Sequence, residues 1–178
     1  KFYFFTNIKK YNIFIDSILI NDKVFAVSIP EEKIQAEVKR VAEKINKDMK
    51  GKDPLFLGVL NGAFMFAADL IKNIDIPCEI TFIRLQSYEG TSSTGTIKKM
   101  LGLSDSIKGR TVIIVEDIVD TGFTMKNLIE DLEKEEPAEI HIATLLVKPD
   151  KLQCPLNIEY AAMHIPNDFI VGYGLDYD

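Results

Sequence analysis

The chain has 178 residues, of which 47% are hydrophobic and 27% are charged, and its formal net charge is −6. This length is enough for one domain with a full core, and the acidic balance argues against a nucleic-acid partner held non-specifically. No segment approaches the ~18 uninterrupted apolar residues of a membrane span, so we expect no membrane partner.

The first residues, 1–18, are rich in aromatic and basic side chains. They lack the continuous apolar centre and the small-residue cleavage site of a signal peptide. Two short strands and a trimmed, disordered leader both fit this composition. We therefore assign residues 1–18 to a leader and 19–178 to one domain. We expect a cytoplasmic protein whose two cysteines, Cys78 and Cys154, stay reduced and lie in or near the core.

The next part of the chain alternates between strand and helix patterns. Residues 23–27 alternate like a strand, and the spacing of Ser28 and Glu31 is that of a capping box, with Pro30 in the first turn of a helix. Apolar residues then recur at helical spacing, at Ile34, Val38, Val41, Ile45 and Met49. Three more elements are predicted before residue 86: a strand over 55–60, an apolar helix over 63–71 and a strand over 78–85.

A polar segment follows, over residues 87–96. Its sequence, SYEGTSSTGT, has two glycines and almost no aliphatic side chain. Such a segment cannot hold itself in a core, so we predict a surface loop. An indifferent linker is one interpretation. The other is a lid over a site, because a long excursion inside a compact domain is commonly functional.

Residues 111–125, TVIIVEDIVDTGFTM, are the most informative segment. The β-branched run 111–115 predicts a buried strand that leads into Glu116 and Asp117. Asp120 and a glycine turn follow, and a helix is predicted over 125–134. Backbone amides at such a turn bind anions, and carboxylates beside it can hold hydroxyl groups or Mg²⁺. The segment therefore predicts a site for a ligand that carries both phosphate and polyol groups.

The remaining pattern predicts three more strands, over residues 138–147, 158–163 and 169–173. Strands that alternate with helices favour an α/β fold with a mainly parallel central sheet flanked by helices. Ligands bind beyond the carboxyl ends of the strands in such sheets. Four side chains that follow predicted strands could therefore line one cleft: Asn61, Glu116, Asp117 and Lys148.

Three other classes of phosphate enzyme fit less well. Neither GxxxxGK[ST] nor GxGxxG occurs, which disfavours a P-loop nucleotidase and a dinucleotide enzyme. An aspartyl-phosphate phosphatase usually carries two aspartates separated by a single residue. The spacing of Asp117 and Asp120 is wider than that.

The run VIIVEDIVDTGFT closely resembles the phosphoribosyl-pyrophosphate motif of type I phosphoribosyltransferases: a hydrophobic strand, two acids, two apolar residues and then Asp-Thr-Gly-x-Thr. Four other segments resemble those of bacterial hypoxanthine (hypoxanthine-guanine) phosphoribosyltransferases, in the same order: LGVLNGAFMFAADL (57–70), RLQSYEGTSSTG (84–95), LLVKPD (145–150) and IPNDFIVGYGLDYD (165–178). The resemblance implies the type I phosphoribosyltransferase fold, with a small hood formed by the N- and C-terminal segments.

The resemblance also implies the residues that bind the phosphoribosyl group. Glu116 and Asp117 would take the ribose hydroxyls, directly or through Mg²⁺. Asp120 would be the general base near the imidazole edge of the purine. Leu60, Asn61 and Gly62 would form the pyrophosphate loop, with a cis peptide bond between the first two. The 5′-phosphate would lie on the helix start, against Asp120, Thr121, Gly122, Phe123 and Thr124.

The purine site is implied in the same way. Lys148 would donate to the 6-oxo group, which explains a preference for hypoxanthine and guanine over adenine. Tyr160 would stack on the base, and Ile165 would pack nearby. Each of these assignments depends on the resemblance, since a strand-end lysine is usually only solvated and an aromatic residue in a strand usually lies in the core.

Two further features concern the lid and the metal. Ser87 and Tyr88 would head a lid that excludes water from an oxocarbenium-like transition state. Asn167 stands where some family members carry an aspartate that helps to hold a second metal ion. An asparagine can accept through its carbonyl but brings no charge, which weakens the expected metal role of Asn167.

The implied function is purine salvage. The chain would transfer the 5-phosphoribosyl group from phosphoribosyl pyrophosphate to hypoxanthine or guanine with Mg²⁺, as a homodimer or homotetramer. One alternative is a regulatory protein that binds phosphoribosyl pyrophosphate without catalysis; the acidic charge and the short leader argue against it. The other is a sibling transferase that prefers xanthine, which the phosphate motif does not exclude.

Overall fold

The computed structural model describes residues 4–7, 17–20, 23–85 and 106–175. The centre of the fold is a five-stranded sheet in the order β5–β4–β6–β7–β8, and all of its pairings are parallel. Its strands are β4 (Leu55–Leu60), β5 (Glu79–Arg84), β6 (Thr111–Val119), β7 (Glu139–Val147) and β8 (Tyr160–His164). The predicted mainly parallel sheet is confirmed.

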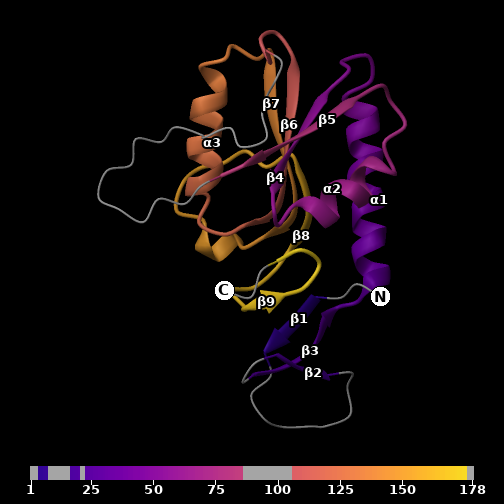
Figure 1. The fold of residues 1–178 in the computed structure, drawn as a ribbon, viewed down its shortest axis with the longest axis vertical. Helices are drawn as coiled ribbons and strands as arrows, with labels where there is room; N and C mark the ends of the chain where they lie inside the picture. Colours follow the sequence, from indigo (N-terminus) through magenta and orange to yellow (C-terminus); the bar gives the residue numbers. More distant parts are fainter. Residues whose placement is uncertain (1–3, 8–16, 21–22, 86–105, 176–178) are drawn as a thin grey trace.

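Helices cover both faces of this sheet (Figure 1). They are α1 (Glu31–Asp48), α2 (Phe64–Ile71) and α3 (Phe123–Glu133). Ile113 and Val115 of β6 join the core formed with α1 and α2, whereas Val112 and Ile114 join the core formed with α3. Because successive side chains of a strand point to opposite faces, the unbroken apolar run of β6 is buried on both sides. None of the helices in the described ranges is long and apolar enough to cross a membrane.

A second sheet is antiparallel and forms the expected hood. Its four strands follow the order β2–β3–β1–β9. They are β1 (Phe4–Asn7), β2 (Ser17–Ile20), β3 (Lys23–Ile29) and β9 (Ile170–Val171). β1 pairs with both β3 and β9, so the N- and C-terminal segments meet in one sheet. Figure 1 shows this sheet at the end of the molecule where β8 continues into β9.

The beginning of the chain therefore contains short strands, which was one of the two interpretations of residues 1–18. β1 lies within this segment, and β2 begins in it. The division of the chain at residue 19 stays a prediction.

Several predicted boundaries are wrong. β6 continues to Val119 because its pairing with β7 continues through Val119 and Val147, so the two neighbouring acids lie inside the strand. The capping box is also wrong. Ser28 belongs to β3, Pro30 occupies the N-cap of α1, and no side chain caps that helix. The helix that follows the glycine turn, α3, begins at Phe123 rather than at residue 125.

Candidate active site

Glu116 and Asp117 lie side by side near the carboxyl end of β6, and each is only 8% exposed. Glu116 lines a pocket at the start of α3. Asp117 lies against Gly62 of the loop after β4, because a Cβ added at Gly62 would overlap the Asp117 carboxylate. Asp117 Oδ1 also accepts a hydrogen bond from the amide of Ile118 at 2.8 Å. The two acids thus belong to two neighbouring parts of the site.

The charge of this pair is poorly compensated. Burial raises the pKa of the Glu116 carboxyl well above its usual value, and the adjacent Asp117 raises it further. Within the described ranges, no ion pair involves either acid. A bound cation would relieve this repulsion, and carboxylate oxygens are the donors that Mg²⁺ prefers.

The protein supplies only part of a metal site. In the part of the chain that the structure describes, no three His, Cys, Asp or Glu side chains are grouped to hold a metal ion. Mg²⁺ is commonly bound by one or two carboxylates together with water and substrate phosphates. Glu116 and Asp117 fit that pattern, in which the substrate completes the coordination.

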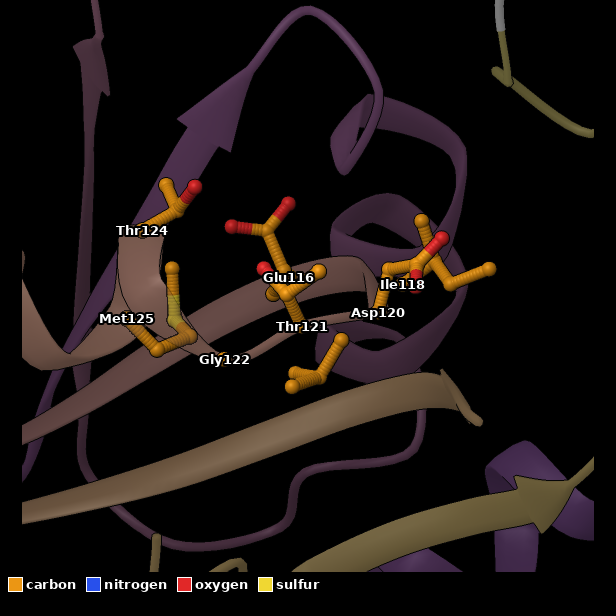
Figure 2. A pocket seen from close by; sticks show the side chains of 8 residues that line it. Glu116, Ile118, Asp120, Thr121, Gly122, Thr124 and Met125 are labelled. Atoms are coloured by element: carbon orange, nitrogen blue, oxygen red, sulfur yellow. The ribbon is translucent and has the colours of Figure 1, made fainter. Parts of the chain in front are cut away.

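The turn between β6 and α3 forms a pocket of about 140 Å³. Its lining comes entirely from the end of β6, the turn and the start of α3: Glu116, Ile118, Val119, Asp120, Thr121, Gly122, Thr124 and Met125. Figure 2 shows the Glu116 carboxylate and the Thr124 hydroxyl on the same side of the turn, with Asp120 beside Ile118 at the other end. The first amides of a helix have no partner within it, so the start of α3 can donate to an anion here.

Gly122 makes this turn possible. Its φ angle is 87°, in the left-handed region that favours glycine. A Cβ at this position would come within 2.9 Å of both Cys154 Sγ and Leu156 Cδ1. Phe123, the first residue of α3, is 47% exposed, so its side chain leaves the turn open. The predicted phosphate turn therefore has the expected backbone form, and Cys154 is buried directly beneath it.

Asp120 lies beside two lysines. Its Oδ2 atom is 3.5 Å from Lys148 Nζ and 3.2 Å from Lys151 Nζ. Among the described residues its Oδ1 atom is buried and has no hydrogen-bond partner. The Asp120 side chain as a whole is 37% exposed, so a ligand can reach the carboxylate and pass it a proton.

The second lysine was missed at the sequence level. Lys151 ends the short 3₁₀ helix η1 (Pro149–Lys151), which turns it back toward Asp120. Lys148 is 8% exposed, and its amide donates to the carbonyl of Val119 at 3.0 Å, which joins the ends of β7 and β6. The sequence KPDK (148–151) alone does not show that Lys151, as well as Lys148, lies beside Asp120.

The predicted pyrophosphate loop lies next to the two acids of β6. The peptide bond between Leu60 and Asn61 is cis, as the resemblance implies. Asn61 is exposed, and Gly62 contacts Asp117 on one side. Gly174 lies on another side, since a Cβ there would come within 2.5 Å of the Gly62 carbonyl oxygen. The loop is thus enclosed by β6 and by the segment that follows β9.

Ile165 lies beside the lysine that follows β7, and its packing near a purine base stays a prediction. Its amide donates to the carbonyl of Val147 at 2.9 Å, next to Lys148. Asn167 is exposed on the same segment, between β8 and β9. Ser87 and Tyr88, the predicted lid, lie outside the described residues.

The base-stacking role predicted for Tyr160 is wrong. Tyr160 begins β8 opposite Ala143, whereas it is the far end of β8, at His164, that lies beside the end of β7. The ring is 3% exposed, its hydroxyl donates to Asp48 Oδ2 at 3.4 Å, and the Lys44 ammonium lies 4.9 Å from its centroid. The predicted strand 158–163 placed Tyr160 near its middle, whereas the observed strand begins at Tyr160, at the end that lies against α1.

Comparison with known proteins decides the family. A family model described as the phosphoribosyl transferase domain matches residues 29–178. The chain belongs to the phosphoribosyl transferase family. Its type I phosphoribosyltransferase fold is confirmed by solved structures that are similar over most of the chain.

Relatives of this phosphoribosyl transferase chain carry more specific names. The hypoxanthine-guanine phosphoribosyltransferase of Lactococcus lactis is 44% identical over 153 residues, which cover 85% of this chain and 83% of that protein. A crystal structure of a hypoxanthine-guanine phosphoribosyltransferase from Bacillus anthracis is 39% identical, with a TM-score of 0.75 and coverage of 83% and 85%. The hypoxanthine phosphoribosyl transferase of Trypanosoma cruzi is 34% identical, with a TM-score of 0.77 and coverage of 95% and 88%.

The buried Glu116 of this phosphoribosyl transferase leads to a prediction about stability. Since its pKa is raised in the folded protein, the unfolded chain loses the proton first as pH rises above the ordinary value of 4.5. Folding stability then falls with rising pH until Glu116 ionises in the folded state. Without metal or substrate at neutral pH, we expect Glu116→Gln to be more stable by on the order of 1 kcal/mol, or about 2–4 °C in melting temperature.

Thermal melts at several pH values would measure this gain, which should shrink below pH 4.5, where Glu116 is protonated in both states. Glu43→Gln, at an exposed position of α1, is the matched control and should leave the melting temperature unchanged. A lower melting temperature for Glu116→Gln at neutral pH would contradict the destabilising burial of the Glu116 charge.

Proposed function

We propose that the chain is a purine salvage enzyme that transfers the 5-phosphoribosyl group from phosphoribosyl pyrophosphate to hypoxanthine or guanine, giving IMP or GMP and pyrophosphate. The observation that carries this proposal is the pair of Asp120 and Lys148, an acceptor and a donor 3.5 Å apart. A 6-oxopurine presents O6 and N7 on one edge. Lys148 can donate to O6, and Asp120 can take a proton from N7. Adenine presents an amino group in place of O6, to which a lysine cannot donate.

The reaction follows from this arrangement. Purine N9 forms a bond to ribose C1′ while the bond from C1′ to the pyrophosphate oxygen breaks. The proton on purine N7 passes to the Asp120 carboxylate, whose side chain is 37% exposed. Lys148 holds O6, and Lys151 stays with Asp120 Oδ2. A positioned general base of this kind contributes about 10²–10⁴-fold to the rate.

The phosphoribosyl group lies across the end of β6 in this proposal. The pocket at the start of α3 takes the 5′-phosphate, and Glu116 takes the ribose hydroxyls. Asp117 and the loop 60–62 face the diphosphate. Glu116 and Asp117 would hold Mg²⁺ together with substrate oxygens, and the ion would neutralise the charge on the leaving diphosphate.

Phe169 takes the stacking role that Tyr160 does not fill. It lies on the segment between β8 and β9, four positions after Ile165, and it is 48% exposed. Its ring centroid is 6.3 Å from that of Phe25, a fully buried residue of the hood strand β3. A half-exposed ring beside a buried one can offer part of its surface to a purine. In the sequence, an aromatic residue at the end of the polar stretch PNDF (166–169) is the signal that could have identified Phe169 as a candidate for this role.

The remaining features of the proposed enzyme are carried over from the sequence. Ser87 and Tyr88 head the lid, Asn167 assists the metal only through its carbonyl, and the protein works in the cytoplasm as a homodimer or homotetramer. Sedimentation of the purified protein at several concentrations measures the oligomeric state, and a monomer throughout would exclude both assemblies.

One assay tests the function. Purified protein, Mg²⁺ and phosphoribosyl pyrophosphate are mixed with hypoxanthine, guanine, xanthine, adenine or uracil in turn, and nucleotide formation is followed. We expect nucleotide with hypoxanthine and guanine. Product with xanthine alone would favour the sibling transferase. No product with any base, in protein that still binds phosphoribosyl pyrophosphate, would favour the regulatory protein.

Lys148→Met should weaken the discrimination between bases. Loss of one charged hydrogen bond, worth about 1.5–3 kcal/mol, lowers kcat/KM for hypoxanthine by about 10- to 10²-fold, while the low value for adenine stays similar. Steady-state kinetics with both bases gives the ratio. Lys151→Met is the matched control, because it removes the other lysine of Asp120 and leaves the O6 contact intact. An unchanged hypoxanthine-to-adenine ratio in Lys148→Met would remove Lys148 from base recognition.

A further inference from the structure

Asp69 of α2 connects three segments beside the loop 60–62. Its Oδ2 atom accepts hydrogen bonds from the Tyr173 hydroxyl at 2.5 Å and from Gln35 Nε2 at 2.7 Å. Its Oδ1 atom accepts one from Lys72 Nζ at 2.9 Å. Gln35 belongs to α1, and Tyr173 belongs to the segment after β9. With the Asp69 side chain 13% exposed and Tyr173 4% exposed, this network lies inside the protein.

The protonation states of the network are well defined. Burial alone would raise the pKa of Asp69, but the hydrogen bonds from Tyr173, Lys72 and Gln35 hold it below its ordinary value. Burial and the Asp69 carboxylate together raise the pKa of Tyr173 above its ordinary value. At neutral pH, Asp69 is therefore an anion and Tyr173 is a hydrogen-bond donor.

The residue after Tyr173 links the network to the loop. The φ angle of Tyr173 is 49°, a left-handed conformation that non-glycine residues seldom adopt, so the surrounding contacts must hold it there. This conformation brings Gly174 against the carbonyl of Gly62, and Gly62 in turn contacts Asp117. A continuous series of contacts thus runs from α1 and α2 to the acid that faces the diphosphate.

We propose that Tyr173, Asp69 and Gln35 are positioning residues for the diphosphate part of the site. Their hydrogen bonds hold the turn at Gly174 against Gly62, and Gly62 then sets the position of the Asp117 carboxylate. None of the three belongs to the pocket that takes the 5′-phosphate or to the Asp120–Lys148 pair. The assignment rests on the proposed function for the identity of the substrate, and it places this network on the pyrophosphate side alone.

Tyr173→Phe tests the proposal, because it removes the hydroxyl and keeps the ring. We expect KM for phosphoribosyl pyrophosphate to rise about tenfold, at the lower end of what loss of a hydrogen bond to a charged group produces because Tyr173 acts only through Gly174 and Gly62, while KM for hypoxanthine stays within twofold. Calorimetric titration with pyrophosphate and Mg²⁺ should show a similar loss of affinity. Asp69→Asn, which keeps an acceptor for the Tyr173 hydroxyl, should lose less affinity for pyrophosphate than Asp69→Ala.

Tyr160→Phe is the matched control. It also removes a buried tyrosine hydroxyl from a helix carboxylate, Asp48, but at the amino end of β8. KM for phosphoribosyl pyrophosphate should not change in this variant. Equal losses in the two Tyr→Phe variants, or an equal rise of both substrate KM values in Tyr173→Phe, would show a general loosening and overturn the proposal. Unchanged pyrophosphate affinity in folded Tyr173→Phe would also overturn it.

The binding measurement separates this proposal from the proposed function. If the wild-type chain forms no nucleotide with any base, but Tyr173→Phe still weakens pyrophosphate binding, the transferase assignment fails and the positioning network stands. If the wild-type chain is active and Tyr173→Phe matches it in both KM values and in pyrophosphate affinity, the positioning network fails alone.

Discussion

Asp120→Asn should lower turnover by about 10²–10⁴-fold and change the affinity for phosphoribosyl pyrophosphate by no more than a few-fold. The asparagine side chain has nearly the same shape, but it cannot take the purine N7 proton. It also no longer offers Lys148 and Lys151 a charged partner. The backbone that forms the phosphate turn stays in place, so the sugar phosphate should still bind.

Single-turnover rates with saturating hypoxanthine and direct titration with phosphoribosyl pyrophosphate measure the two effects separately. Asp150→Asn, at an exposed acid of η1, is the matched control and should keep the wild-type rate. A turnover of Asp120→Asn near that of the wild type would mean that Asp120 is not the general base.

Gly62→Ala should lower kcat/KM for phosphoribosyl pyrophosphate by about 10²-fold. A Cβ at this position overlaps Asp117 Oδ2, so the carboxylate must move by about the distance that commonly costs this factor in an active site. Steady-state kinetics measures the loss. Gly51→Ala is a suitable control, since a Cβ at Gly51 meets nothing within 4 Å, and it should leave kcat/KM unchanged.

A double-mutant cycle tests whether the loss arises at this contact. In an Asp117→Ala background the carboxylate is gone, so Gly62→Ala should cost little more. Strict additivity of the two losses would mean that Gly62→Ala acts elsewhere than on Asp117. A kcat/KM within twofold of the wild type for the single variant would contradict the overlap itself.

Local sequence patterns were sufficient for most of the parallel sheet. The apolar run at the start of β6 predicted a buried strand, and the glycine turn predicted the start of a helix; both are present, and the anion site at that turn stays a prediction. The failures lie at the ends of elements. Whether β6 stops before Glu116 or continues to Val119 depends on its pairing with β7, which is a contact between distant segments.

The site was harder to predict where it depends on packing between segments. The contact between Gly62 and Asp117 joins two loops that no periodicity relates. Tyr160 and Phe169 are both aromatic residues near predicted strands, and only the register of β8 shows that Tyr160 lies at the wrong end. The resemblance supplied the role of Lys148, but the second lysine on Asp120 required the three-dimensional turn of η1.

The pairing of β1 with β9 has a consequence for the order in which the protein folds during synthesis on the ribosome. Thr6 pairs with Ile170, so β1 can pair with β3 early, but its other edge is paired only after β9 has been synthesised. β6 and α3, which form the phosphate pocket, are complete long before that point. A nascent chain can therefore form the turn at the start of α3 early, whereas the contact of Gly174 with Gly62 is made only after β9 has been synthesised. The two parts of the proposed site are thus completed at different stages, and the part proposed to face the diphosphate follows the phosphate turn.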